Sequence, residues 1–88
     1  RPSHIPAGSV CRVPVTSTDF FPTFLDLAGL ADDPRRAAGL DGRSLLPLFG
    51  NPETTPDRDA LFWHYPHYYE TTTPVSAVRV GDWKLLEY

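Results

Sequence analysis

The chain has 88 residues, of which 41% are hydrophobic and 22% charged, with ten prolines and six glycines among them. This length supplies at most one small domain, much of it in turns and loops. A formal net charge of −3 argues against a general nucleic-acid binder, which needs a basic face. No apolar run approaches the roughly 20 residues that span a bilayer.

One main helix is predicted from Asp19 to Gly29, after a connecting loop over residues 1–15. Asp19 is expected to cap it, Pro22 is tolerable only in its first turn, and Gly29 ends it in the left-handed conformation. Its broad apolar face is predicted to carry Phe20, Phe21, Phe24, Leu25 and Ala28. So short a chain offers too little apolar surface to cover three phenylalanines, so the helix is expected to need a larger partner.

A second, short helix is predicted over residues 45–49, with Ser44 as its cap and Gly50 closing it. The segments on either side are polar or rich in Pro and Thr, and they are expected to be loops. Cys11 lies in a valine-rich extended segment, where it is predicted to be buried and structural rather than part of a Cys–His nucleophile. A single cysteine excludes an internal disulfide.

The C-terminal third is predicted to form a strand at 60–65 and a hairpin of strands 76–80 and 83–87. The pair Gly81-Asp82 is a two-residue turn with glycine first, and such a turn fixes the hairpin register. One face is then apolar and carries Val78, Val80, Trp83 and Leu85.

The other face of this hairpin places Arg79 opposite Lys84. Like charges in directly opposite positions are unfavourable. Each cation is therefore expected to meet a carboxylate or a bound anion, and a neighbouring carboxylate such as that of Asp82 or Glu87 is the preferred option.

Residues 61–69, LFWHYPHYY, concentrate five aromatic side chains and two histidines where the first strand passes into a loop. These side chains stack and hydrogen-bond, and imidazole can change charge near neutral pH. No metal site is predicted, because zinc needs three or four ligands and the other candidates, His4 and Cys11, are far away in sequence. Two interpretations of His64 and His67 stay open. They contact a ligand in a pocket made largely by other parts of a protein, or they are a pair of hydrogen-bonded, half-buried histidines at a strand-to-loop junction.

Four blocks, in this order and spacing, resemble the C-terminal part of type I sulfatases, the arylsulfatase-like members of the alkaline phosphatase superfamily. They are TDFFPTFLDLAGL, LDGRSLLPLF, RDALFWHYPHYY and SAVRVGDWKLLEY. The opening IPAGSVCRVPV resembles the segment that precedes the helix in that family. The resemblance covers essentially the whole chain, and we expect the chain to be a fragment of a longer enzyme, called the parent enzyme below.

The resemblance implies an α/β fold for the parent enzyme and α+β structure within this chain. Residues 1–50 are expected to be the tail of the large α/β domain, and their helix at 19–29 to pack on that domain. Residues 60–88 are expected to begin the sheet of the smaller C-terminal subdomain. The family also implies a periplasmic or secreted enzyme.

The resemblance further implies hydrolysis of sulfate esters, carbohydrate sulfates among them. The family uses a formylglycine made from Cys or Ser in a C/S-x-P-x-R motif, and a calcium ion held by Asp and Asn ligands. This chain departs from that motif, because the proline after Cys11 comes one place too late and the arginine is missing. No catalytic residue and no metal ligand is therefore assigned here, and calcium and formylglycine are expected upstream in the parent enzyme.

In the family, the C-terminal subdomain closes one side of the active-site cleft. His64 is therefore the first candidate for substrate contact and His67 the second, while Tyr65 is expected to stack on a sugar or aryl ring. The chain alone is expected to be inactive. Two alternatives remain: a related phosphoester or phosphonate hydrolase of the same superfamily, and a carbohydrate-binding or interaction module without catalysis.

Overall fold

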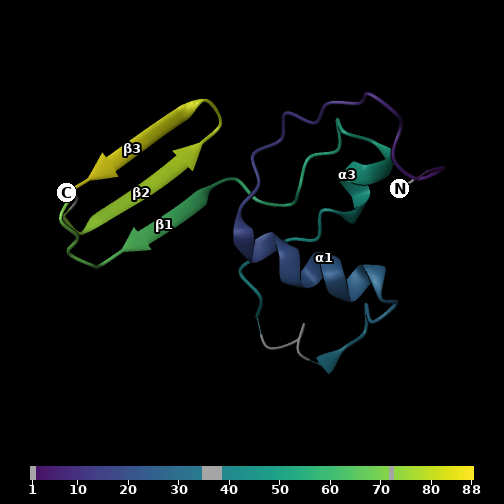
Figure 1. Ribbon diagram of the computed structural model, residues 1–88, viewed down its shortest axis with the longest axis horizontal. Helices are drawn as coiled ribbons and strands as arrows, with labels where there is room; N and C mark the ends of the chain where they lie inside the picture. The colour runs from purple at the N-terminus through teal and green to yellow at the C-terminus, as the bar shows by residue number, and fades with distance from the viewer. Residues whose placement is uncertain (1, 35–38, 72) are drawn as a thin grey trace. The chain divides into compact units, whose positions relative to one another are not determined.

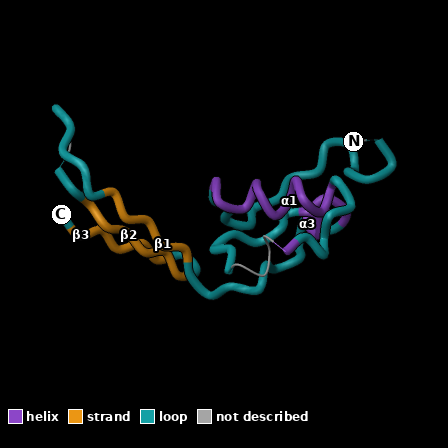
Figure 2. The backbone as a smooth tube through the Cα atoms, turned by 90° about the horizontal axis from the view of Figure 1, so that it is seen from below, coloured by secondary structure: helices purple, strands orange, loops and turns teal. Residues whose placement is uncertain are grey.

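The computed structural model describes residues 2–34, 39–71 and 73–88, and it separates into two compact units, Arg1–Asp57 and Arg58–Tyr88. The first unit holds the helices and the second holds a three-stranded sheet (Figure 1, Figure 2). The mixed α+β character predicted for the chain is confirmed. Within the described ranges, no helix is long and apolar enough to cross a membrane.

The main helix, α1, spans Phe20–Leu27 and follows a single 3₁₀ turn, η1, at Ser17–Asp19. It ends in a Schellman motif, in which Gly29 N–H donates to Asp26 O and Leu30 N–H donates to Leu25 O at 2.8 Å. Gly29 has a φ of +74°, so the predicted left-handed end of the helix is confirmed.

Asp19 stands at the start of α1 as predicted, but its carboxylate does not cap that helix. One oxygen accepts the N–H of Thr16 and the other accepts the N–H of Arg43, both at 2.9 Å, and Asp19 is fully buried. One turn later, the Thr23 hydroxyl donates to Asp19 O and accepts the N–H of Leu45 at 2.8 Å. These two side chains, four residues apart on one helix face, hold the segment before the second helix against α1.

The second helix, α3, spans Leu46–Gly50, one residue later at each end than predicted. Ser44 lies one place before the cap position, yet its Oγ still accepts the N–H of Leu46 at 3.3 Å. Only glycine fits at position 42, two residues before Ser44, because a Cβ there would overlap the backbone carbonyl of Thr18. Glycine thus permits the close approach on which the Asp19 hydrogen bonds depend.

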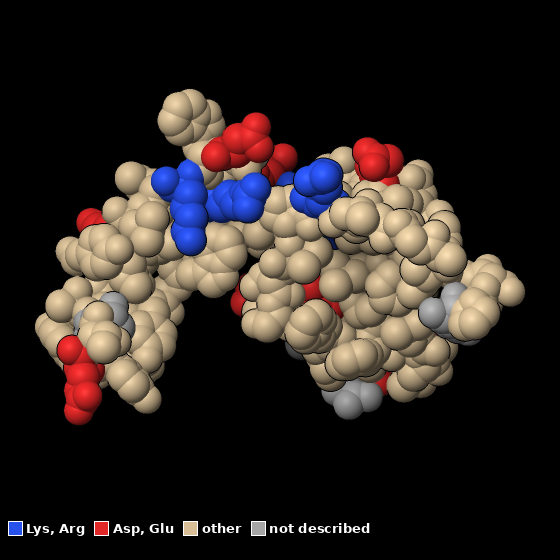
Figure 3. Space-filling view, turned by 45° about the horizontal axis from the view of Figure 1, so that its top comes forward, with Lys and Arg blue, Asp and Glu red and all other residues tan. Residues whose placement is uncertain are grey.

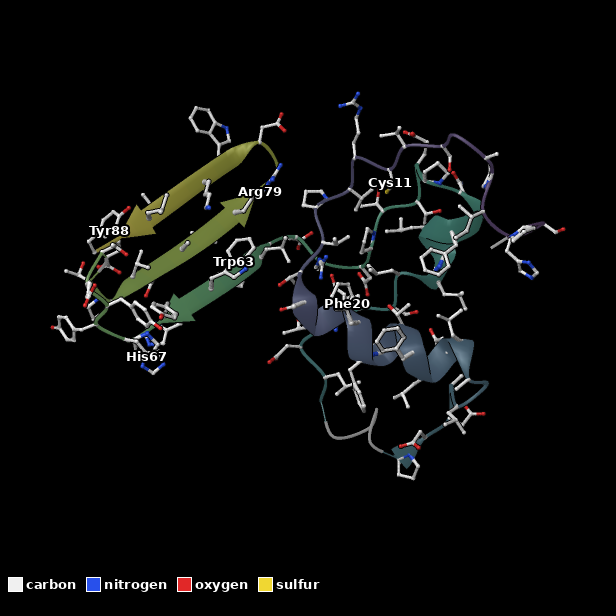
Figure 4. All side chains as sticks on the ribbon, viewed as in Figure 1. Cys11, Phe20, Trp63, His67, Arg79 and Tyr88 are labelled. Carbon is white, nitrogen blue, oxygen red and sulfur yellow. The ribbon has the colours of Figure 1, made fainter. Side chains whose placement is uncertain are left out.

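The phenylalanines of α1 remain exposed, and 64% of the Phe24 surface is accessible (Figure 4 labels Phe20). The buried side of the helix carries Pro22, Thr23 and Leu25 instead. Leu25 was predicted to share the aromatic face, and that detail is wrong because Leu25 is buried while the phenylalanines are exposed. We predicted that the phenylalanine face of α1 needs a further partner to cover it, and this stays a prediction.

Cys11 is exposed, which contradicts the prediction that it is buried (Figure 4). Its Sγ donates to Pro52 O at 3.3 Å. The neighbouring Val10 is exposed as well. The valine-rich opening segment therefore runs over the surface of its unit instead of entering a core.

The second unit is an antiparallel sheet with the strand order β1-β2-β3. The strands are β1 at Leu61–Tyr65, β2 at Val75–Val80 and β3 at Trp83–Glu87. The predicted hairpin register is confirmed, since Val80 pairs with Trp83 and Arg79 with Lys84. Gly81 has a φ of +54°, as the first position of a glycine-first turn requires.

We predict that Asp19→Ala destabilises the first unit by about 1–3 kcal/mol for each of the two backbone N–H groups that it leaves without an acceptor. The readout is amide hydrogen exchange of residues 16 and 43, which is expected to accelerate by at least about tenfold for each 1.4 kcal/mol lost. Asp32→Ala is the matched control, because that residue is exposed in a loop. Equal protection in both variants would contradict the role given to Asp19.

Candidate functional site

Two of the three candidate residues, His64 and Tyr65, lie on opposite faces of the sheet, and His67 follows in the loop after β1. His64 pairs with Ser76, whereas Tyr65 pairs with Val75, and successive side chains of a strand point to opposite faces. The Phe62 face carries Phe62, His64, Ser76, Val78, Val80, Trp83, Leu85 and Glu87. The Trp63 face carries Leu61, Trp63, Tyr65, Val75, Ala77, Arg79, Lys84 and Leu86.

His64 belongs to a polar row that crosses all three strands. Its Nδ1 lies 3.0 Å from Ser76 Oγ, and Ser76 pairs in turn with Glu87 on β3. The hydrogen bond engages Nδ1, so Nε2 is the ring nitrogen that can form a further hydrogen bond. The His64 imidazole is exposed. This agrees with the interpretation as a ligand-contacting side chain and not with the interpretation as a half-buried histidine.

An apolar row runs directly beside this polar row. Phe62 pairs with Val78, and Val78 pairs with Leu85. Both rows line one open hollow of about 470 Å³ on the sheet. Apolar walls with a few polar groups at one side are typical of small-molecule sites.

Tyr65 and His67 come together away from His64. Their ring centres are 5.1 Å apart at an interplanar angle of 74°, an edge-on contact. Pro66, between them, follows the last residue of β1 and has no N–H to continue the ladder. The structure therefore unites two of the three predicted contact residues and leaves His64 on the other face (Figure 4 labels His67).

Arg79 and Lys84 lie opposite each other as predicted, and basic side chains gather over the sheet in Figure 3. Arg79 Nε donates to Gly81 O at 3.0 Å, and Lys84 Nζ lies 5.6 Å from the centre of the Trp63 ring. Such a cation–π contact contributes about 0.5–1 kcal/mol at an exposed site. Glu87 was one expected partner, and that expectation is wrong because the register places it on the opposite face.

Two members of the polar row, Ser76 and Glu87, were not predicted as neighbours of His64. The register of β2 and β3 could be counted from their two-residue turn. The register of β1 and β2 could not, because residues 66–74 form a longer connection that fixes no pairing. Once both pairings are known, counting along the strands finds the row.

Within the described ranges, no group of three His, Cys, Asp or Glu side chains is arranged to hold a metal ion. The sheet can offer a ligand three kinds of interaction: hydrogen bonds from the polar row, stacking on the aromatic rings of the sheet, and ionic contacts with its charged side chains.

The whole sequence, residues 1–88, matches the protein family described as N-sulphoglucosamine sulphohydrolase, C-terminal. The chain belongs to this sulfatase C-terminal family. The predicted resemblance to the C-terminal part of a sulfatase is thereby confirmed.

Two curated sulfatases are similar to the chain along nearly its whole length. It is 33% identical, over 99% of its residues, to the N-acetylglucosamine-6-O-sulfatase of Bacteroides thetaiotaomicron. It is 29% identical, over 98% of its residues, to the arylsulfatase K of Danio rerio. The chain spans only 16% and 18% of the lengths of these two proteins, respectively.

We predict that Ser76→Ala changes the tautomer and orientation of the His64 ring, because it removes the hydroxyl that lies 3.0 Å from Nδ1. The measurement is the pair of imidazole ¹⁵N chemical shifts of His64. Ser76→Thr keeps a hydroxyl and suits a strand, so it is expected to restore the wild-type shifts.

The matched control is Val75→Ala, on the same strand but on the opposite face. It weakens packing without touching the imidazole. If Val75→Ala and Ser76→Ala moved the His64 shifts equally, general loosening of the sheet would explain both, and the hydrogen bond would have no special role.

Proposed function

We propose that this chain is the C-terminal part of an enzyme that hydrolyses sulfate esters, and that its sheet contributes one wall of the substrate cleft. The observation that carries the proposal is the match of all 88 residues to a sulfatase C-terminal family. The names of the two relatives, both sulfatases, support the same reaction class. The exposed polar and aromatic groups around β1 are the part of the chain best suited to touch a substrate.

The proposed roles follow from the two faces. His64 forms a hydrogen bond with a substrate hydroxyl through Nε2, since Nδ1 is engaged by Ser76. Tyr65 and His67, already packed edge to edge, supply a stacking surface for a sugar or aryl ring. Because His64 and Tyr65 lie on opposite faces of β1 and His67 packs on Tyr65, we assign His64 and the Tyr65–His67 pair to different parts of the substrate.

The family's calcium ion and formylglycine do not fit the residues of this chain. The described residues offer no cluster of metal ligands, and the sequence around Cys11 does not match the formylglycine motif. No catalytic step is therefore assigned to these residues. Their proposed work is to bind and orient the substrate, which raises the rate by holding the ester in a reactive geometry.

We expect the purified 88-residue chain to show no hydrolysis of 4-nitrophenyl sulfate, because it lacks a nucleophile of the required kind. The parent enzyme, assayed beside it, is expected to release 4-nitrophenol. Turnover by the chain alone would overturn the proposal that the chemistry resides elsewhere. Turnover of 4-nitrophenyl phosphate but not of the sulfate by the parent enzyme would favour the related phosphoester hydrolase.

We expect His64→Ala in the parent enzyme to lower kcat/KM for a carbohydrate sulfate by up to about tenfold, the value of one hydrogen bond of about 0.5–1.5 kcal/mol. The melting temperature is expected to stay unchanged, because the ring is exposed. His4→Ala is the matched control, an exposed histidine in the other unit. A lower melting temperature with normal kcat/KM per folded molecule would instead assign His64 a structural role.

A further inference from the structure

The hollow on the Phe62 face has an unbalanced charge. Among the described residues, its lining includes one carboxylate, that of Glu87, and no lysine or arginine. The cations of the hairpin, Arg79 and Lys84, lie on the Trp63 face because of the strand register. An anionic group entering the hollow would therefore meet a like charge without a compensating cation from these strands.

The rest of the lining suits a ring that is apolar on one side and polar at its edge. Phe62, Val78 and Leu85 form the apolar row, and 76% of the Phe62 surface is accessible. The polar row contributes the outward nitrogen of His64 at one end and the Glu87 carboxylate at the other. A pyranose ring matches this arrangement, since its C–H groups pack on apolar side chains and its hydroxyls donate and accept hydrogen bonds.

We propose that the hollow holds an uncharged sugar ring of the substrate, and that Glu87 is a specificity-determining residue that rejects a ring carrying a second anionic group. The inference rests on the proposed function for the identity of the reaction. It assigns the sulfate to be cleaved to a position outside the hollow. Preferred substrates are then rings without an additional sulfate or carboxylate at the edge that faces Glu87.

The first experiment measures kcat/KM of the parent enzyme for two sulfate esters of one sugar, one with a single sulfate and one with a second sulfate on the same ring. Glu87→Gln keeps the side-chain length and removes the charge. It is expected to raise kcat/KM for the doubly sulfated ester, relative to the singly sulfated one, by about tenfold, which corresponds to roughly 1.4 kcal/mol. The gain is expected to shrink as salt is added, because screening acts over about 8 Å at 0.15 M.

Glu70→Gln is the matched control, since Glu70 is exposed and does not line the hollow. It is expected to leave the ratio unchanged. An unchanged ratio in Glu87→Gln, or an equal change in both variants, would overturn the proposal.

A second measurement does not depend on hydrolysis. Methyl resonances of Val78 and Leu85 in the parent enzyme are followed during titration with methyl glucopyranoside and with glucose 6-sulfate. The neutral sugar is expected to shift them in the wild type, and the sulfated sugar to do so only in Glu87→Gln. No shift with the neutral sugar would overturn the proposed hollow, whatever the activity. These shifts in a parent enzyme that cleaves no sulfate ester would instead overturn the proposed function and leave the hollow standing.

Discussion

The two-residue turn at Gly81-Asp82 is the constraint on which the functional part of the sheet depends. Gly81 supplies the positive φ that lets β2 and β3 leave the turn in one register. A slip of one residue would send every side chain of a strand to the other face. Glu87 would then join Arg79 on the Trp63 face while Lys84 moved to the Phe62 face, so neither face would keep its net charge. One backbone conformation thus determines which side of the sheet is acidic and which is basic.

The first unit depends in a similar way on one buried carboxylate. Burying a charge is costly unless hydrogen bonds replace its hydration. Asp19 meets this condition with the backbone N–H groups of Thr16 and Arg43, and Gly42 admits the approach. These hydrogen bonds hold the segment that leads to α3 in one conformation. They are needed because that segment has few apolar side chains of its own for packing.

Local signals predicted most of the fold. Gly29 and the Gly81-Asp82 turn act within a few residues of themselves, so their effect could be worked out from sequence spacing alone. Two of the features that sequence spacing did not predict are hydrogen bonds to distant partners. Asp19 bonds to a residue 24 positions away, and His64 to one 12 positions away across an unpredicted pairing. Such contacts are decided by how segments pack, and sequence periodicity carries no information about which of several polar groups will meet.

The same limit applies to the aromatic and histidine-rich stretch at 61–69, which looked like one cluster in the sequence. Strand alternation divides it: His64 lies with Glu87 on one face, and Tyr65 lies with Trp63 and the cations on the other. A sulfated sugar has the same two-sided character, since its charge is confined to part of the molecule. In the proposed function, the acidic and apolar face and the basic and aromatic face therefore contact different parts of such a ligand, and the opposite signs of their charges favour one orientation of it.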